Sequence, residues 1–377
     1  MKIRTKIIFT SLALVLVTVV SVLGIAMYQN TILSQRVSGE IDSLARREAA
    51  CISQDVYLMC RSAQESVQLM VDASLNVARD TLTSMGGVDF DDETVEWQAI
   101  NQYTKQSQTL ALPRMMVGET SLGQNTRVDV VTPVVDKVQT LVGGTVTIFQ
   151  RMNDQGDMLR VATNVVTKKG QRAVGTYIPH TDPDGRTNPV IAKVLSGETY
   201  RGRAFVVDDW YITAYEPIWD KQHATVIGIL YVGVQQENIE SLRHGILDIK
   251  VGESGYVYVL GGKGELKGSY IISQGGKRDK ENILDAKDAD GELIIRNIVD
   301  KALALPPHKP GEIPIAFEHY NWKDSGSNIA RSKVAAITYF APWDWVVVAG
   351  YYTDDFAASH NLVNDAVATQ LMWIVSI

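Results

Sequence analysis

The sequence has few of the residues that build catalytic, metal-binding or disulfide-linked sites. It contains two cysteines and six histidines in 377 residues, and it lacks the GxSxG, HExxH and GxxxxGK[ST] motifs. Cys51 and Cys60 lie in a predicted helix, about 13 Å apart along its axis, which is beyond the reach of a disulfide within one chain. The histidines form no pair with metal-ligand spacing. We therefore expect no metal, no cofactor and no enzymatic activity, while an interchain disulfide stays open.

The sequence also lacks a concentration of positive charge. Its formal net charge is −7, and its lysines and arginines form no stripe, which argues against binding to nucleic acid. Two short segments look like ligand-binding loops but are better explained as turns. Gly261–Gly264 lacks the ending of a phosphate-binding loop, so we expect a hairpin turn there. Asp182–Gly185 has too few acidic positions for a calcium loop.

A long uncharged run follows a basic N-terminus. Lys2, Arg4 and Lys6 precede Ile7–Tyr28, a run long enough, at about 1.5 Å per residue, to cross a bilayer of about 30 Å. A cleaved signal peptide is the alternative, but the run exceeds the usual signal core of about 7–15 residues. The positive-inside rule then places residues 1–6 in the cytoplasm and the chain after this transmembrane helix outside the inner membrane.

The last residues of the sequence are also apolar. Val367–Ile377 carries no charge but is too short to span a bilayer. We expect residues 357–377 to form an exit helix and the start of a second transmembrane helix. A domain between two membrane crossings is the layout of a receptor, whose cytoplasmic output would follow Ile377.

A stretch without proline, with Gly39 as its single glycine, runs from Thr31 to about Met85. Apolar residues recur there at steps of three, four or seven, which predicts one long helix, called the stalk helix below. The predicted apolar stripe consists of Ile52, Val56, Met59, Ala63, Val67, Met70 and Val77. A helix of this length is typical of a coiled coil, so we expect it to form a homodimer; packing only on its own domains is the alternative. Gly86-Gly87 is expected to end it.

The region after the stalk helix is predicted to form the first of two α+β units. The acidic cluster 89–92 is expected to cap a helix at 93–108, because carboxylates favour the positive end of a helix dipole. A basic loop at 167–189 precedes a helix at 190–196. Segments rich in β-branched residues predict strands. These strands are the hairpin 143–151 and 158–166 and the three-stranded meander 200–207, 210–218 and 225–235.

The same order of elements then repeats. The second unit is predicted to contain helix 236–248, strands 255–260 and 268–273, helix 291–304, and strands 312–322, 331–340 and 344–352. The fold class is therefore α+β, with a long N-terminal stalk helix that carries two antiparallel-sheet domains between transmembrane helices. We assign 29–109 to the stalk helix and second helix, 110–236 to a membrane-distal domain and 237–356 to a membrane-proximal domain.

Candidate ligand-binding residues gather around the middle strand of the meander. Tyr211, Thr213 and Tyr215 alternate along it and share one face, which suits a sheet that lines a polar cavity. Cations of loop 167–189 and of strand 200–207 are expected to converge there and hold a small organic anion or amino acid. The expected ligand-binding residues are Tyr211, Thr213, Tyr215, Arg203, Arg201, Phe205, Lys168, Arg172, Tyr177 and Thr163. A tyrosine face open to water and solvated loop charges are the alternatives.

Several segments match a known family. They are VEWQAINQYTKQ (95–106), LVGGTVTIFQRMNDQGDMLRVATNV (141–165), GQRAVGTYIP (170–179), YRGRAFVVDDWYITAYEPI (200–218), GILYVGVQQE (228–237), VGESGYVYVL (251–260) and WDWVVVAGYYTDDF (343–356). The chain thus resembles the extracellular part of bacterial methyl-accepting chemotaxis receptors with a tandem Cache 3–Cache 2 sensor. The resemblance covers nearly the whole chain. It implies a PAS-like sheet in each unit, a dimeric stalk helix, and ligand capture in the membrane-distal unit.

The resemblance also implies limits on the ligand. Cache 3-type sensors of citrate and related acids hold carboxylates with two cations on the strand that ends in Pro-Ile. Thr213 and Tyr215 occupy those positions in YITAYEPI (211–218), which argues against a di- or tricarboxylate. The segment GSYIISQ (268–274) lacks the His-Pro pair of many Cache 2 domains, so we expect the proximal unit to relay the signal.

Several outputs stay open for such a sensor. The resemblance implies a HAMP linker and a signalling hairpin after the chain. A histidine kinase or a diguanylate cyclase could follow instead. A module that docks a periplasmic binding protein is the alternative of a different class.

Overall fold

The computed structural model describes residues 3–236, 240–307, 309, 311–324, 329–356 and 369. The predicted exit helix and second transmembrane helix therefore lie outside the described residues, apart from Thr369. The chain divides into two compact units. Unit 1 consists of Met1–Met59 and Arg243–Ile377, and unit 2 consists of Cys60–Leu242.

Helix α1 (Ile3–Ser84) confirms the stalk helix and continues through the predicted membrane segment. It ends at the expected glycines: the amide of Gly86 donates to the carbonyl of Thr83, and that of Gly87 to Leu82. Both glycines have positive φ angles, which they adopt without steric cost. The predicted apolar stripe is only partly correct, because Val56 is buried but Met70 is exposed. The buried apolar residues of α1 are Ala45, Ala49, Val56, Tyr57, Cys60, Val71, Leu75, Ala78 and Leu82.

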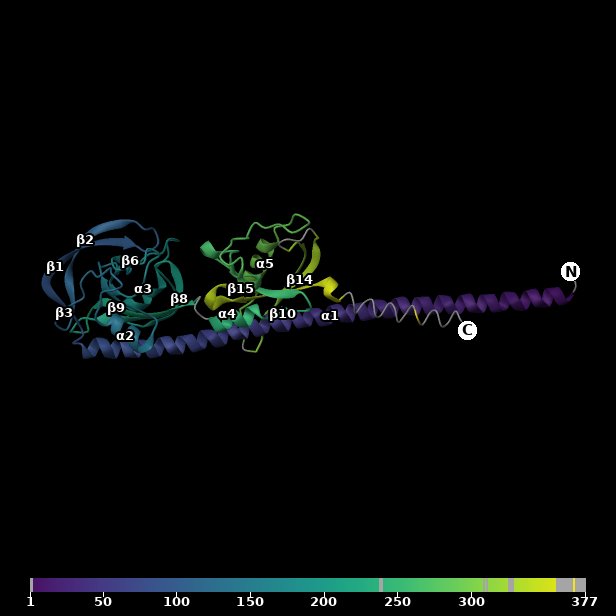
Figure 1. The fold of residues 1–377 in the computed structure, drawn as a ribbon, viewed down its shortest axis with the longest axis horizontal. Helices are drawn as coiled ribbons and strands as arrows, with labels where there is room; N and C mark the ends of the chain where they lie inside the picture. Colours follow the sequence, from purple (N-terminus) through teal and green to yellow (C-terminus); the bar gives the residue numbers. More distant parts are fainter. Residues whose placement is uncertain are drawn as a thin grey trace. The chain divides into compact units, whose positions relative to one another are not determined.

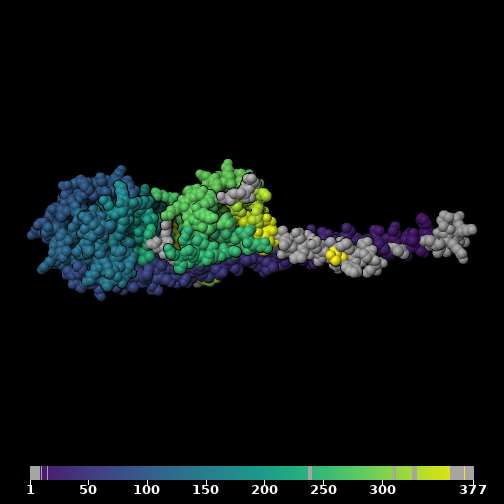
Figure 2. Space-filling view, in the orientation of Figure 1, coloured from purple at the N-terminus to yellow at the C-terminus, as the bar shows by residue number. Residues whose placement is uncertain are grey.

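The N-terminal part of α1 exposes its apolar side chains. Phe9, Leu12 and Leu14 are between 69% and 71% exposed; this part of the helix is coloured purple in Figure 2. The most apolar window of α1 has a mean hydropathy of 2.3. By length and composition, this helix can cross a membrane.

Unit 2 is built on a nine-stranded sheet in the order β3-β2-β1-β6-β5-β4-β9-β8-β7 (Figure 1). Its strands are β1 (Val88–Asn101), β2 (Ser107–Val117), β3 (Thr120–Ser121), β4 (Thr145–Arg151), β5 (Met158–Thr163), β6 (Thr176–Ile178), β7 (Tyr200–Val206), β8 (Asp209–Trp219) and β9 (Val226–Gln235). β1 and β6 pair in parallel, and the other neighbours pair antiparallel. The predicted hairpin and three-stranded meander are confirmed as β4–β5 and β7–β8–β9.

The helix predicted at 93–108 is wrong, because β1 and β2 occupy this stretch. Trp97 and Ala99 of β1 are buried, whereas Glu96 and Gln98 are exposed, which is the period of two of a strand. The acidic cluster 89–92 therefore caps no helix. Asp91 instead pairs with Arg114 of β2 across the hairpin.

Two helices accompany the sheet of unit 2. α2 (Val135–Val142) was not expected, whereas α3 (Pro189–Leu195) confirms the helix predicted at 190–196. α3 begins at Asn188, whose side chain accepts hydrogen bonds from the amides of Val190 and Ile191. The segment 167–189, expected to be a loop throughout, contains the short strand β6.

Unit 1 contains a six-stranded sheet in which β10-β11-β15-β14-β13 are neighbours and β12 pairs with β11. Its strands are β10 (Lys250–Val251), β11 (Gly255–Gly261), β12 (Tyr270–Ile272), β13 (Ala316–Trp322), β14 (Arg331–Phe340) and β15 (Trp345–Tyr352). Its helices are α4 (Glu240–Leu247, shared with unit 2), α5 (Ile294–Leu303) and the 3₁₀ turns η2 (Gly264–Leu266), η3 (Gln274–Gly276), η4 (Ala341–Trp343) and η5 (Thr353–Phe356). The β11–β12 pairing confirms Gly261–Gly264 as part of a hairpin turn.

Candidate ligand site of unit 2

One face of the β7–β8–β9 meander carries aligned tyrosines. Directly opposite residues of antiparallel strands point to the same side of a sheet. The register pairs Tyr200 with Tyr215, and Tyr215 with Tyr231. These residues therefore share one side with Tyr211, called the tyrosine face below. It packs in one buried cluster with Val190, Ile191 and Val194 of α3.

The predicted convergence of Arg201 and Arg203 with these tyrosines is wrong. In the register, Arg201 opposes Ala214 and Arg203 opposes Ile212, which places both cations on the other face of the sheet. The Nε of Arg201 donates to Asp72 of α1 at 2.8 Å. Arg203 donates to Gln236 at 2.8 Å, and its guanidinium lies over the ring of Trp210 at 3.9 Å.

Phe205 also lies on this other face. It opposes Trp210 in the register, and its ring stacks on Tyr103 with centroids 5.8 Å apart. The neighbouring Glu216 binds Arg79 of α1. The face opposite the tyrosines is therefore the one that packs on α1, and Phe205 cannot join a site on the tyrosine face.

The loop cations are not placed as ligand-binding groups. Lys168 is exposed on the loop. Arg172 is buried, and its two Nη atoms lie 2.8 Å from the carboxylate oxygens of Asp136. Its remaining donors bind the carbonyls of Thr163, Arg127 and Val130. Arg172 therefore ties the loop to α2, and its hydrogen-bonding capacity is used within the protein.

Three further predicted residues have their hydroxyls engaged in the sheet. Thr163 shares a hydrogen bond of 2.6 Å with Thr147, and Thr213 donates to the carbonyl of Gly202 at 2.7 Å. Tyr177 is half-buried and accepts a bond from Asn101 at 3.4 Å. These residues support strand pairing.

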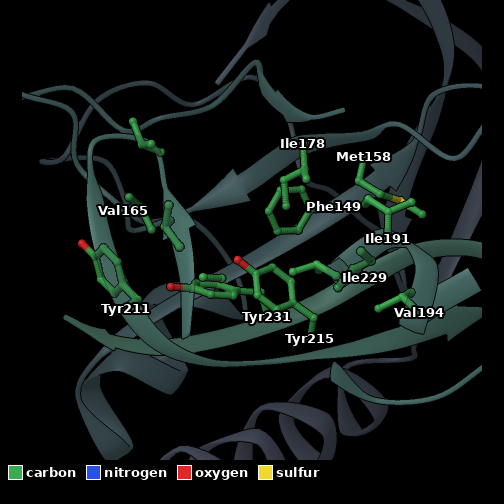
Figure 3. Packing of buried hydrophobic residues seen from close by; sticks show 14 of the residues in the cluster. Phe149, Met158, Val165, Ile178, Ile191, Val194, Tyr211, Tyr215, Ile229 and Tyr231 are labelled. Carbon is green, nitrogen blue, oxygen red and sulfur yellow. The ribbon is translucent and has the colours of Figure 1, made fainter. Parts of the chain in front are cut away.

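Tyr211 and Tyr215 are buried on the tyrosine face. Figure 3 shows their rings beside that of Tyr231, with the three hydroxyl oxygens turned to the same side. The centroids of Tyr215 and Tyr231 are 4.8 Å apart. The hydroxyl of Tyr231 shares a hydrogen bond of 3.0 Å with Thr145. Within the described ranges, the hydroxyls of Tyr211 and Tyr215 have no hydrogen-bond partner.

The tyrosine face surrounds a cation that the sequence analysis missed. Arg160 of β5 is 0% exposed and opposes Phe149 in the register. Its guanidinium carbon lies 4.8 Å from the centroid of the Phe149 ring, and Nη1 donates to Thr176. Nε and Nη2 are buried, and the described part of the chain offers neither of them a hydrogen-bond partner. We call this group with Tyr211, Tyr215 and Tyr231 the Arg160 site.

Electrostatics show that Arg160 is not compensated. Burial lowers its pKa to about 10, and the three tyrosines oppose that shift only weakly. Burial also raises the pKa values of Tyr211 and Tyr215, so both phenols are neutral donors at neutral pH. Among the residues that the structure describes, Arg160 forms no ion pair. A buried unpaired charge costs several kcal/mol. The site therefore favours an anion.

The sequence contained a signal for Arg160 that we did not use. All six residues of β5, MLRVAT, are buried. A strand that is buried on both faces usually consists of apolar residues throughout. An arginine in the centre of such a strand therefore indicates a buried charge that needs an anionic partner.

A cavity of about 320 Å³ lies between α1 and the sheet, where Val232 and Val234 of the α1 side line it. It is lined by α1 residues such as Val71 and by Thr145, Gly233 and Tyr211. Thr145 binds the hydroxyl of Tyr231, and a Cβ at Gly233 would lie 2.2 Å from that same oxygen. Thr145 therefore lies between the cavity and the hydroxyl of Tyr231, and Arg160 does not line the cavity. Its volume suits a small ligand.

A long helix followed by two curled, mainly antiparallel sheets defines a tandem sensor-type α+β domain of the PAS-like class. A family model described as the Cache 3/Cache 2 fusion domain matches residues 34–366. The chain belongs to this family. No match was found among curated proteins.

Three solved structures with related folds are distant in sequence from this chain. The ligand-binding domain of Mlp24 with asparagine is 10% identical, with 87% of this chain and 99% of that chain covered and a TM-score of 0.36. The periplasmic sensory domain of the Campylobacter jejuni chemoreceptor Tlp1 is 11% identical, with 81% and 95% covered and a TM-score of 0.34. A methyl-accepting chemotaxis protein from Vibrio parahaemolyticus RIMD 2210633 is 21% identical, with 31% and 72% covered and a TM-score of 0.25.

Proposed function

We propose that the chain is the extracytoplasmic sensor region of a transmembrane chemoreceptor of the methyl-accepting type, and that unit 2 binds a small organic anion at Arg160. The observation that supports this is the buried guanidinium with two unpartnered donors. An anion that accepts from both donors would replace the lost hydration of the charge. Binding, not catalysis, is the activity of the site.

The geometry favours a ligand with one carboxylate. Nε and Nη2 lie on one edge of the guanidinium, and such an edge binds a carboxylate in bidentate fashion. The free hydroxyls of Tyr211 and Tyr215 can donate to the same ligand. The tyrosine face presents one cation, because Arg201 and Arg203 lie on the other face. One carboxylate balances that charge, whereas a second one would be buried without a partner.

Tyr211 offers a path from solvent to this site. It lines the 320 Å³ cavity and is an electrostatic neighbour of Arg160. Because Arg160 does not line the cavity, the ring of Tyr211 has to move before a ligand in the cavity contacts the guanidinium. Ligand would thus select a conformation in which the tyrosine face is open, to the extent that it binds this conformation more tightly.

The signal would pass from the sheet to α1. Glu216 follows Tyr215 on β8 and binds Arg79 of α1. Arg201 lies on the paired strand β7 and binds Asp72 of α1. A shift of β8 on ligand binding would therefore pull on the helix, which continues to the predicted membrane segment. Unit 1 and the segment after Asp354 would complete the relay across the inner membrane. A histidine kinase or diguanylate cyclase output would use the same sensor.

The exposed side of α1 supports a homodimer. Leu44 and Leu58 are 61% and 47% exposed, and Cys51 between them is exposed as well. These three residues are spaced by one heptad and therefore lie on one side of the helix. Apolar side chains at heptad spacing are typical of a coiled-coil seam.

A thermal-shift panel of small organic acids on the full chain in nanodiscs would test the proposed ligand class. We expect at least one monocarboxylate to raise the melting temperature of wild type and of Arg186→Met, a control that removes an exposed arginine. At pH 8, Arg160→Met should lose that shift. A panel in which no anion stabilises wild type, or in which Arg160→Met responds as wild type does, would reject the proposal.

A further inference from the structure

Unit 1 also buries a cation among tyrosines. Lys333 of β14 is 1% exposed and opposes Tyr352 of β15 and Tyr320 of β13 in the register. Its side chain crosses β15 at Gly350, where a Cβ would lie 2.7 Å from the Cε of Lys333. The ammonium nitrogen therefore reaches β11, where it lies 3.6 Å from the centroid of Tyr256.

The ammonium group has no direct counter-ion among the described residues. It lies 4.8 Å from the centroid of Tyr352 and donates to the hydroxyl of that residue at 3.4 Å. Tyr352 in turn donates to both carboxylate oxygens of Asp324 at 2.7 Å. The phenol of Tyr352 thus lies between Asp324 and Lys333 in this chain of hydrogen bonds. Ring faces stabilise an ammonium ion but do not replace its full hydration.

The other cations around Lys333 are already paired. Arg331, on the same strand, lies over Tyr352 at 3.9 Å and binds Asp354 and Asp355. Arg278 lies 5.5 Å from the ring of Tyr270 and binds Glu281. Tyr258 and Tyr320 complete the group, with hydroxyls 3.3 Å apart. Lys333 is therefore the one cation of this group without a carboxylate partner in the described part of unit 1.

We propose that unit 1 holds a second ligand site, in which Lys333 supplies the positive charge and the surrounding tyrosines the walls, for a compact organic anion with one carboxylate. A single charge matches a single ammonium group. Tyr258 and Tyr320 share one hydrogen bond, so one of their two neutral hydroxyls keeps a free proton that can be donated to the second carboxylate oxygen. A phosphate dianion would bring more charge and more acceptors than this group can satisfy.

Binding at this site depends on pH. Burial lowers the pKa of Lys333 to about 7; Asp324 raises it, whereas Arg331 lowers it further. The anion binds the charged form, so binding takes up a proton near neutral pH and weakens as pH rises. Between pH 6 and pH 8 the charged fraction of a group with this pKa falls about tenfold. Arg160, with a pKa of about 10, stays charged across this range.

Calorimetric titration of sodium acetate into the full chain in nanodiscs would test the second site. The background is Arg160→Met, which removes the site of unit 2 and replaces a buried charge with an apolar chain of similar length. We expect saturable acetate binding at pH 6 that is about tenfold weaker at pH 8. Adding Lys333→Met should abolish it. Adding Lys287→Met, the loss of an exposed lysine, should leave it unchanged.

A second measurement keeps the test valid if Lys333→Met does not fold. In the Arg160→Met chain at pH 7.5, the observed heat of acetate binding should differ between buffers of different ionisation enthalpy, because a proton is taken up. Three results would overturn the proposal: no saturable acetate binding in the Arg160→Met background at pH 6, equal affinity at pH 6 and pH 8, or binding that persists in folded Lys333→Met.

Discussion

The guanidinium carbon of Arg160 lies 4.8 Å from the centroid of Phe149, its partner across the β4–β5 pair. The ring offers partial stabilisation, but Nε and Nη2 stay unpartnered within the described residues. A buried charge in this arrangement lowers the stability of the ligand-free protein and favours the binding of an anion. Replacing a buried, uncompensated charge by an apolar side chain is expected to stabilise the ligand-free protein.

We therefore predict that Arg160→Met raises the free energy of unfolding of unit 2 by about 1–4 kcal/mol in the absence of ligand. Amide hydrogen exchange in β4 and β5 measures it, because these strands report the core of unit 2. Arg186→Met should change protection by less than about 0.5 kcal/mol. Faster exchange throughout β4 and β5 of Arg160→Met would mean that the guanidinium is a structural group.

Two tyrosines of the same face should respond differently to loss of the hydroxyl. Tyr231 shares a hydrogen bond with Thr145, whereas the hydroxyl of Tyr215 has no partner in the described ranges. Tyr231→Phe should destabilise unit 2 by about 1 kcal/mol. Tyr215→Phe should leave stability unchanged and weaken anion binding about tenfold, measured by chemical denaturation and calorimetry. Equal affinity in Tyr215→Phe and wild type would remove this residue from the site.

The stability of unit 1 should rise with pH through the neutral range. Because the pKa of Lys333 is lowered to about 7 in the fold, the unfolded chain binds more protons between that value and its ordinary pKa. The free energy of unfolding should therefore increase from pH 7 to pH 9, by at most about 1.4 kcal/mol per unit. Tyrosines do not interfere, since burial raises the pKa values of Tyr256 and Tyr270. Lys333→Met should remove this increase, and hydrogen exchange of β14 and β15 measures it. The same pH dependence in Lys333→Met and in wild type would contradict the prediction.

The native cysteines report on the proposed dimer. Cys51 is exposed in line with Leu44 and Leu58, whereas Cys60 is buried and its pKa is raised to about 12 by that burial. Mild oxidation of the full chain in membranes should yield a disulfide-linked dimer on non-reducing gels. Cys51→Ser should abolish the dimer band, and Cys60→Ser should retain it. A band that depends on Cys60, or a chain that stays monomeric, would contradict the seam.

The sequence predicted most of the elements but not the composition of the site. Glycine pairs, turn residues and β-branched runs located α1 and the β7–β8–β9 meander. The stretch 93–108 failed because its acidic start suggested a helix cap, while the alternation of Trp97 and Ala99 was the stronger signal. The wrong placement of Arg201 and Arg203 and the failure to predict Arg160 have one physical origin. Alternation assigns residues to a face within one strand only.

The register between strands decides which residues meet. Arg201 and Arg203 share a face with one another, but pairing to Ala214 and Ile212 turns them away from the tyrosines. Arg160 reaches the tyrosines from β5, and β4 and β9 lie between this strand and β8 in the sheet order. Such a contact depends on the pairing of strands that are distant in sequence, and single-strand patterns do not contain it.

The most direct test of the central claim is calorimetric titration of the most stabilising monocarboxylate into the full chain in nanodiscs, at a pH of 8, where the charge of Lys333 is largely lost. The Arg160 site predicts that Arg160→Met weakens binding at least about 100-fold, from the loss of two charge-assisted hydrogen bonds. Arg186→Met should bind within about twofold of wild type. Wild-type affinity in folded Arg160→Met would show that the anion binds elsewhere.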